Sequence, residues 1–181
     1  MRKIVGIFFA LVMAAPIGVI AAAPAGAAAA GTTCKSFAGT ASFNPTIPKL
    51  GSGSKVKSVL SGTGSLSGCS GTVSGGSVKF VSAKSAAENC QTLGTPPTAA
   101  IKATEVIAWS NGKTSTVAIK LAEIPGNPVT TQAVTGTVTA GAFKGLHEKA
   151  RLMYSALNAG GCVGSGLSKI SFQTSGSVTF K

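Results

Sequence analysis

The stretch "WSNGKTSTVAIKLAEI" (Trp109–Ile124) joins a turn signal to a strand pattern. Asn111 and Gly112 both tolerate positive φ angles, which a type I′ β-hairpin turn requires. After the turn, polar or small residues alternate with apolar ones from Thr116 to Leu121, so that one face of a strand would be apolar. This stretch therefore predicts a β-hairpin between two half-buried strands.

The same combination recurs along the rest of the chain. Short stretches rich in Val, Ile, Thr and Phe are separated by Gly, Ser, Asn and Pro, which is typical of an all-β domain. The expected strands are Ser36–Phe43, Lys55–Leu66, Ser77–Ser82, Ala99–Trp109, Thr114–Ala122, Thr131–Thr139, Leu146–Ser155 and Ser168–Lys181. We expect a single antiparallel domain of about eight strands, either a closed up-and-down β-barrel or a β-sandwich.

The stretch "GLHEKARLMYSAL" (Gly145–Leu157) is the most ambiguous part of this pattern. Its local propensity favours a helix, because its apolar residues fall on one helical face and it is rich in good helix formers. As a strand, it would place Glu148 on the same face as Leu152 and Tyr154. The residues of the stretch alone favour the helix.

The first 27 residues have the order of features of a secretory signal peptide. Arg2 and Lys3 precede an apolar run over residues 4–23, and Ala25-Gly26-Ala27 offers an A-x-A cleavage site. We expect residues 1–27 to be cleaved and residues 28–181 to be exported as one secreted domain. No transmembrane segment is expected after cleavage.

All four cysteines, Cys34, Cys69, Cys90 and Cys162, lie in the expected secreted part. An even number in an exported chain predicts two disulfides, and the gaps of 35, 21 and 72 residues lack the close pairs of a zinc site. If consecutive strands run antiparallel, with residues 146–157 as a strand, Cys34 and Cys69 fall at one end of the sheet. Cys90 and Cys162 then fall at the other end. Because a disulfide needs Cα atoms within about 7 Å, the expected pairs are Cys34–Cys69 and Cys90–Cys162.

Residues that carry catalytic chemistry are few. The expected secreted part has one His, four Glu and no Asp. A Ser–His–acid triad would need His147 with a glutamate, and the neighbouring Glu148 would point to the opposite face of a strand. Glu105 and Glu123, on adjacent strands, are the conceivable paired carboxylates for glycoside hydrolysis. Since neither a G-x-S-x-G nor an H-E-x-x-H motif is present, we expect no catalytic site, no cofactor and no metal site.

Three residues are candidate ligand contacts: Trp109, Tyr154 and His147. Trp109 and Tyr154 are the only Trp and Tyr of the chain. A Trp beside a hairpin turn can stack on a sugar or a base, but more often it packs over the end of a barrel or sandwich.

Charge is the one sequence feature that suggests a partner. Without Arg2 and Lys3, 14 Lys and Arg stand against 4 Glu, a net charge of about +10. Such a charge favours adhesion to polyanions, including anionic cell-envelope polymers, although it also simply keeps a surface solvated. Specific nucleic-acid binding is not expected, because only Arg151 could make bidentate contacts and few aromatic residues could stack on bases.

Two motifs carry a resemblance to a known group of proteins. They are W-S-N-G-x-T-S-T at Trp109–Thr116 and G-x-V-T-x-G-x-F-x-G at Gly136–Gly145. With the order of the cysteines and the closing "SVTFK", they resemble a widespread group of small secreted actinobacterial β-proteins with two disulfides. The resemblance covers nearly the whole expected secreted part and implies a β-strand after the second motif, so we expect Leu146–Ser155 to be a strand. It implies no activity.

These observations favour a secreted, non-enzymatic β-domain that binds at or near the cell envelope through a basic surface. The first alternative is a carrier of a small apolar ligand, which would need a barrel lumen that side chains do not fill. The second is an uncommon secreted hydrolase. An apolar cavity would favour the carrier, and a contact between His147 and a glutamate beside a cleft would favour the hydrolase.

Overall fold

The computed structural model describes residues 30–92, 100–123, 131–154 and 159–181 of the 181-residue chain. The predicted signal peptide and its cleavage site therefore lie outside the described residues. Within the described part, no helix has both the length and the apolar character needed to cross a membrane.

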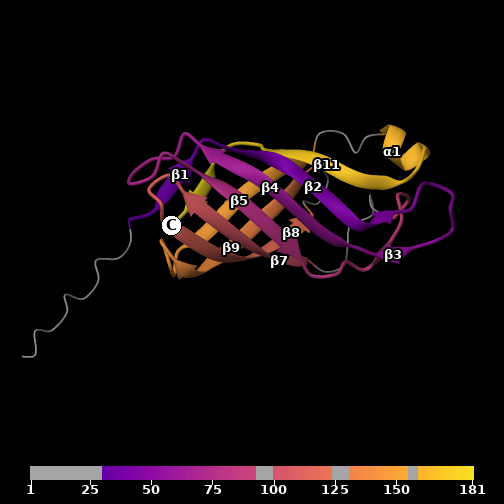
Figure 1. Cartoon of the computed structure of the whole chain (residues 1–181), viewed down its shortest axis with the longest axis horizontal. Coiled ribbons are helices and arrows are strands. Elements are labelled where there is room, and N and C mark those ends of the chain that lie inside the picture. The colour runs from indigo at the N-terminus through magenta and orange to yellow at the C-terminus, as the bar shows by residue number, and fades with distance from the viewer. Residues whose placement is uncertain (1–29, 93–99, 124–130, 155–158) are drawn as a thin grey trace, which may run out of the picture.

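Eight antiparallel strands form a closed barrel (Figure 1). They are β2 (Ser36–Ile47), β4 (Val59–Ser67), β5 (Gly75–Ser82), β7 (Ile101–Trp109), β8 (Thr114–Glu123), β9 (Thr131–Gly141), β10 (His147–Tyr154) and β11 (Leu167–Thr174). Each of these strands pairs with the next one along the chain, and β11 closes the ring by pairing with β2. The predicted all-β antiparallel fold is confirmed, and of the two expected architectures the chain adopts the barrel.

Residues 147–154 form a strand rather than a helix. Seven residue pairs, from His147 with Thr137 to Met153 with Thr131, join β10 to β9. The other edge of β10 pairs with β11 and with β12 (Val178–Phe180). Pairing on both edges outweighs the local helix propensity, and the short helix α1 begins only at Ala159.

The β7–β8 hairpin forms where Asn111-Gly112 predicts it, but the predicted type I′ turn is wrong. Gly112 has a φ of 78°, whereas Asn111 does not have a positive φ. The amide of Gly112 donates to the Trp109 carbonyl (3.0 Å) and the Trp109 amide donates to the Lys113 carbonyl (2.8 Å). Since Trp109 is bonded to Lys113, three residues lie between them and the loop is longer than two residues. The Asn111 side-chain oxygen accepts a hydrogen bond from the Lys113 amide (3.1 Å).

Two short strands extend the sheet at the end of the barrel where the chain terminates. The predicted strand Ser168–Lys181 is divided into β11 and β12, and Gly176 between them has a φ of 97° that glycine adopts without strain. Strand β12 also pairs with β1 (Thr32–Cys34). The Cys34–Cys69 disulfide lies at this end, as predicted.

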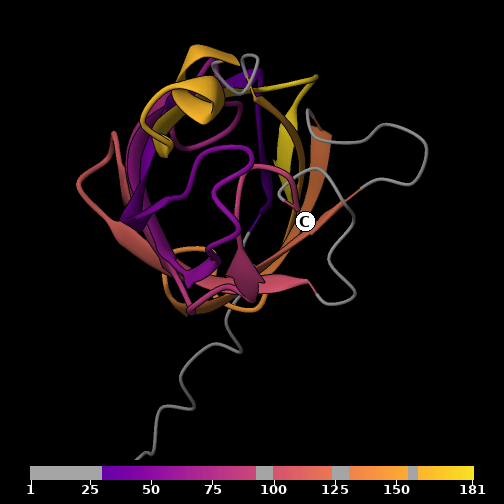
Figure 2. The same ribbon diagram turned by 90° about the vertical axis from the view of Figure 1, so that its right-hand side faces the viewer.

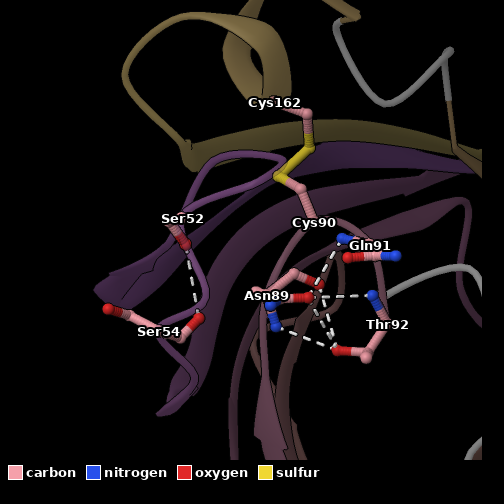
Figure 3. The surroundings of a disulfide bond; sticks show 7 residues. All are labelled: Ser52, Ser54, Asn89, Cys90, Gln91, Thr92 and Cys162. Atoms are coloured by element: carbon pink, nitrogen blue, oxygen red, sulfur yellow. Dashed lines mark hydrogen bonds between the residues drawn. A yellow bond between two sulfur atoms is a disulfide. The ribbon is translucent and has the colours of Figure 1, made fainter.

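The opposite end carries helix α1 (Ala159–Val163) and a separate two-stranded sheet of β3 (Val56–Lys57) and β6 (Ala87–Glu88). Figure 2 looks onto this end, where the segment between β2 and β4 lies across the ring of strands. The predicted Cys90–Cys162 disulfide joins the chain after β6 to α1 (Figure 3). Both predicted disulfide pairs are confirmed, and they staple opposite ends of the barrel.

A hydrogen-bonded turn holds Cys90 in position. The Asn89 side-chain oxygen accepts hydrogen bonds from the amides of Gln91 (3.1 Å) and Thr92 (3.0 Å), as Figure 3 shows. The Cys90 amide donates to the Pro48 carbonyl (2.9 Å). This last bond attaches the turn to the segment that follows β2.

Aromatic side chains fill much of the lumen. Phe172 makes edge-to-face contacts with Phe37 (5.1 Å between ring centroids) and with Phe80 (5.7 Å). Gly64 makes room for one of these rings, because a Cβ there would lie 2.5 Å from Cε2 of Phe37. The lumen is therefore a packed core with little free space.

Candidate functional site

Strand β10 has a basic outer face and an acidic position on its inner face. His147, Lys149 and Arg151 are exposed, whereas Glu148 is 2% exposed. Successive side chains of a strand point to opposite faces, so the strand places its cations in solvent and its carboxyl group in the lumen. This arrangement creates two candidate sites, one on the outer surface and one inside the barrel.

The outer site is a row of three lysines that crosses strands β7 to β10, which we name the basic row: Lys102, Lys120 and Lys149. Lys102 of β7 is the direct cross-strand partner of Lys120 of β8. Thr135 of β9 pairs with Lys120 on one side and with Lys149 of β10 on the other. All three lysines are exposed, and at about 4.8 Å per strand their Cα atoms span roughly 15 Å. Arg151 follows Lys149 on the same outer face.

Two of the four glutamates of the chain do not offset this positive charge. Glu105 of β7 and Glu148 of β10 are each 2% exposed and point into the lumen. The outer surface is consequently more basic than the net charge of the chain indicates. Lysines that face each other directly also repel one another, which destabilises the pair unless an anion lies between them.

The inner site is a cavity that Glu105 and Glu148 share. The rest of its wall is apolar apart from the hydroxyl of Tyr154, and it includes the rings of Phe37, Phe80 and Phe172. The space open to the centre of a water molecule is about 20 Å³, which is room for about one water.

Gly136 of β9, the cross-strand partner of Glu148, leaves room for the Glu148 carboxylate. A Cβ at Gly136 would lie 3.2 Å from Glu148 Oε2 and 2.8 Å from Cγ2 of Ile119. Among the described residues, Oε2 of Glu148 has no hydrogen-bond partner. A buried acceptor without a partner is costly, so this oxygen marks a position that suits a donor.

Both lumen carboxyl groups favour their protonated forms. Burial raises the pKa of Glu105 well above its usual value, and the nearby charge of Glu148 raises it further. Burial also raises the pKa of Glu148, from 4.5 to about 7. Removal from water disfavours the charged form of each group, and two carboxylates in one apolar cavity resist simultaneous ionisation. The pair can therefore hold a proton near neutral pH or bind a positively charged donor.

The carboxyl group that shares a cavity with Glu105 is that of Glu148, and the side chain of Glu123 lies outside the described residues. A sugar ring needs far more space than one water molecule, so this cavity does not admit a glycoside in the described conformation. An apolar ligand of ordinary size would likewise have to displace side chains of the lumen. His147 lies on the opposite face of β10 from Glu148, so these two residues cannot form part of one triad.

The three predicted ligand contacts are not brought together. Trp109 is 4% exposed and packs edge-on against Phe143 and Phe180, while its indole N–H donates to Ser115 (2.8 Å). It thus closes one end of the barrel and is a core residue.

Of the other two candidates, only Tyr154 reaches the lumen cavity. Tyr154 is half-buried, lines that cavity and donates its hydroxyl proton to Gln132 Oε1 (2.6 Å). His147 is exposed, and its Nδ1 lies 3.3 Å from the Thr137 hydroxyl.

The sequence analysis did not predict that Glu105 and Glu148 share a cavity. The sequence did indicate that Glu105 faces inward, because the alternation of β7 places it on the buried face with Ala103, Ile107 and Trp109. Within the described ranges, no group of three or more His, Cys, Asp or Glu side chains is arranged to hold a metal ion.

Comparison of the chain with family models, with curated proteins and with solved structures gives no match.

Proposed function

We propose that the chain is an exported, non-enzymatic protein that binds anionic polymers of the cell envelope through the basic row. The observation that carries the proposal is the direct cross-strand pairing of Lys102 with Lys120, continued by Lys149. Because these like charges repel one another, the row is most stable when anionic groups lie along it. A polymer with repeated phosphate or carboxylate groups supplies such charges at successive positions.

Other features support a role outside the cytoplasm. The first 27 residues have the features of a signal peptide. The two disulfides are compatible with an oxidising compartment. The small size of the lumen cavity and the separation of His147 from Glu148 support binding rather than catalysis.

The test compares two triple variants that remove the same charge. Lys102→Gln, Lys120→Gln and Lys149→Gln together remove the basic row, whereas Lys35→Gln, Lys55→Gln and Lys84→Gln remove three scattered exposed lysines. Binding to an immobilised phosphodiester polymer is measured over a range of salt concentrations, with a neutral glucan as the blank.

The basic-row variant should bind roughly 100-fold more weakly at low salt, since each cation near an anionic surface contributes about 1 kcal/mol. The control variant should lose much less, and added salt should weaken binding of all forms. Equal losses in the two variants would show that net charge alone is responsible. If the unmodified protein fails to bind the anionic polymer at low salt, the proposed function is wrong.

A further inference from the structure

The lumen cavity plays no part in the proposed envelope binding. We propose that Glu105 and Glu148 form a binding site for an ammonium ion. Glu105 of β7 and Glu148 of β10 line one cavity, and Oε2 of Glu148 has no partner among the described residues.

The wall of the cavity provides no positive charge. None of the described residues that line it is Lys, Arg or His. Lys102, Lys149 and Arg151, on the same two strands as the glutamates, are exposed on the outside of the barrel. An ionised carboxylate in an apolar cavity therefore needs a cation from outside the chain. An ammonium group supplies both the charge and N–H donors for carboxylate oxygens.

The size of the cavity decides which cation fits. It holds about one water molecule, and an ammonium group is about that size. Calcium takes about 6–8 oxygen ligands, and magnesium needs a near-ideal octahedron with several waters retained. Among the described residues that line the cavity, only two Glu and one Tyr carry side-chain oxygens, which is too few for either metal.

Protons compete with the cation for this site. The ionisable groups that face the cavity are Glu105 from β7, and Glu148 and Tyr154 from β10. The described wall residues from β2, β4, β5, β8, β9 and β11 do not ionise. Since burial raises the pKa of both carboxyl groups, both are neutral in acid and attract no cation. Ammonium binding should therefore appear as the pH rises.

The test is thermal unfolding of the full exported protein in ammonium, methylammonium, tetramethylammonium or sodium chloride at equal ionic strength. Tetramethylammonium is the matched control because it carries the same charge without N–H donors and is larger. At about pH 8, ammonium should raise Tm by roughly 3–6 °C for each tenfold increase in concentration above Kd, and methylammonium, which is larger than the one water molecule that the cavity holds, should raise it less. At about pH 5 the difference between the salts should vanish.

Variants of the glutamates test the site itself. Glu105→Gln and Glu148→Gln should each abolish the difference in Tm between ammonium and tetramethylammonium, whereas Glu88→Gln on β6 should retain it. The variant that lacks the basic row should also retain this difference in Tm. Failure of the ammonium site can therefore be distinguished from failure of the proposed polymer binding.

In ¹⁵N-ammonium, a bound signal with cross-relaxation to the Ile119 methyl groups would place the cation beside Gly136 and Glu148. Equal effects of all four salts at about pH 8 would overturn the inference, and so would an ammonium effect that survives both glutamine substitutions.

Discussion

Replacing Glu148 by Gln should stabilise the barrel at neutral and alkaline pH but not at acidic pH. Burial raises the pKa of Glu148 from 4.5 to about 7, so the folded protein retains a proton that the unfolded chain has already released. Between those two values the folded state binds more protons than the unfolded state. The free energy of unfolding therefore falls as the pH rises through this range.

The size of the effect follows from the difference between the two pKa values. A difference of about 2.5 units corresponds to about 3 kcal/mol, which is fully present below pH 4.5 and lost above about pH 7. The raised pKa of Glu105 extends the loss of stability to higher pH. The chain has no Asp and only two further Glu, so few other carboxyl groups oppose this trend.

The measurement is urea unfolding at several pH values between about 4 and 8, in buffers without ammonium. The fluorescence of Trp109, the only Trp, reports unfolding because the ring is buried between Phe143 and Phe180. At the lowest pH of the series, the Glu148→Gln variant and the unmodified protein should have the same free energy of unfolding. Near the alkaline limit the variant should be about 3 kcal/mol more stable, with a Tm about 6–12 °C higher.

Glu88→Gln is the control, because it removes a carboxyl group that lies on β6 outside the lumen cavity. It should keep the pH dependence of the unmodified protein. An unmodified protein that becomes more stable as the pH rises would contradict this prediction. A Glu148→Gln variant in which the free energy of unfolding keeps the same dependence on pH would also contradict it. Either result would mean that the lumen carboxyl group is solvated or paired in the folded state.

Three further predictions concern the packing at Gly64, the Cys90–Cys162 disulfide and export. Gly64→Ala should cost about 1–3 kcal/mol in urea unfolding, since the new Cβ would lie 2.5 Å from the Phe37 ring, and Ser65→Ala on the outer face should cost little. Replacing Cys90 and Cys162 by Ala should lower the free energy of unfolding by about 4 kcal/mol, because their bond closes a loop of 72 residues. A loss below about 1 kcal/mol would contradict that estimate. N-terminal sequencing should show that the secreted protein begins between Ala28 and Gly31. Full-length protein in the membrane fraction would contradict the predicted cleavage.

Most of the fold could be predicted because its signals are local. Alternation in Thr116–Leu121 and the Asn111-Gly112 signal specify a hairpin without knowledge of the rest of the chain. The disulfide pairs followed from counting strand directions. That count depended on Leu146–Ser155 being a strand, which its own residues did not favour. Closure of the ring by β11 and β2 is a pairing of distant segments, and no local pattern distinguishes it from a sandwich.

The candidate sites were less predictable because they depend on which strands become neighbours. Lys102 and Lys120 can be aligned by extending the hairpin, but Lys149 joins them only once β10 pairs with β9. The alternation of β7 already indicated that Glu105 faces inward. Nothing local to Glu105 indicates that Glu148 shares its cavity, because β8 and β9 lie between their strands and only the curvature of the closed barrel brings them together.

The two charged sites share one physical feature, which is an unfavourable arrangement that a ligand of opposite charge would relieve. An apolar residue in place of a buried ionisable group is often as stable or more stable, and scattered lysines would avoid repulsion on the outer face. At neutral pH the raised pKa of Glu148 corresponds to a loss of about 3 kcal/mol in the free energy of unfolding, and the raised pKa of Glu105 acts in the same direction. An ammonium group in the lumen and an anionic polymer along the basic row would remove these two costs independently. If both proposals hold, ammonium salts should stabilise the barrel without changing its affinity for the polymer at constant ionic strength.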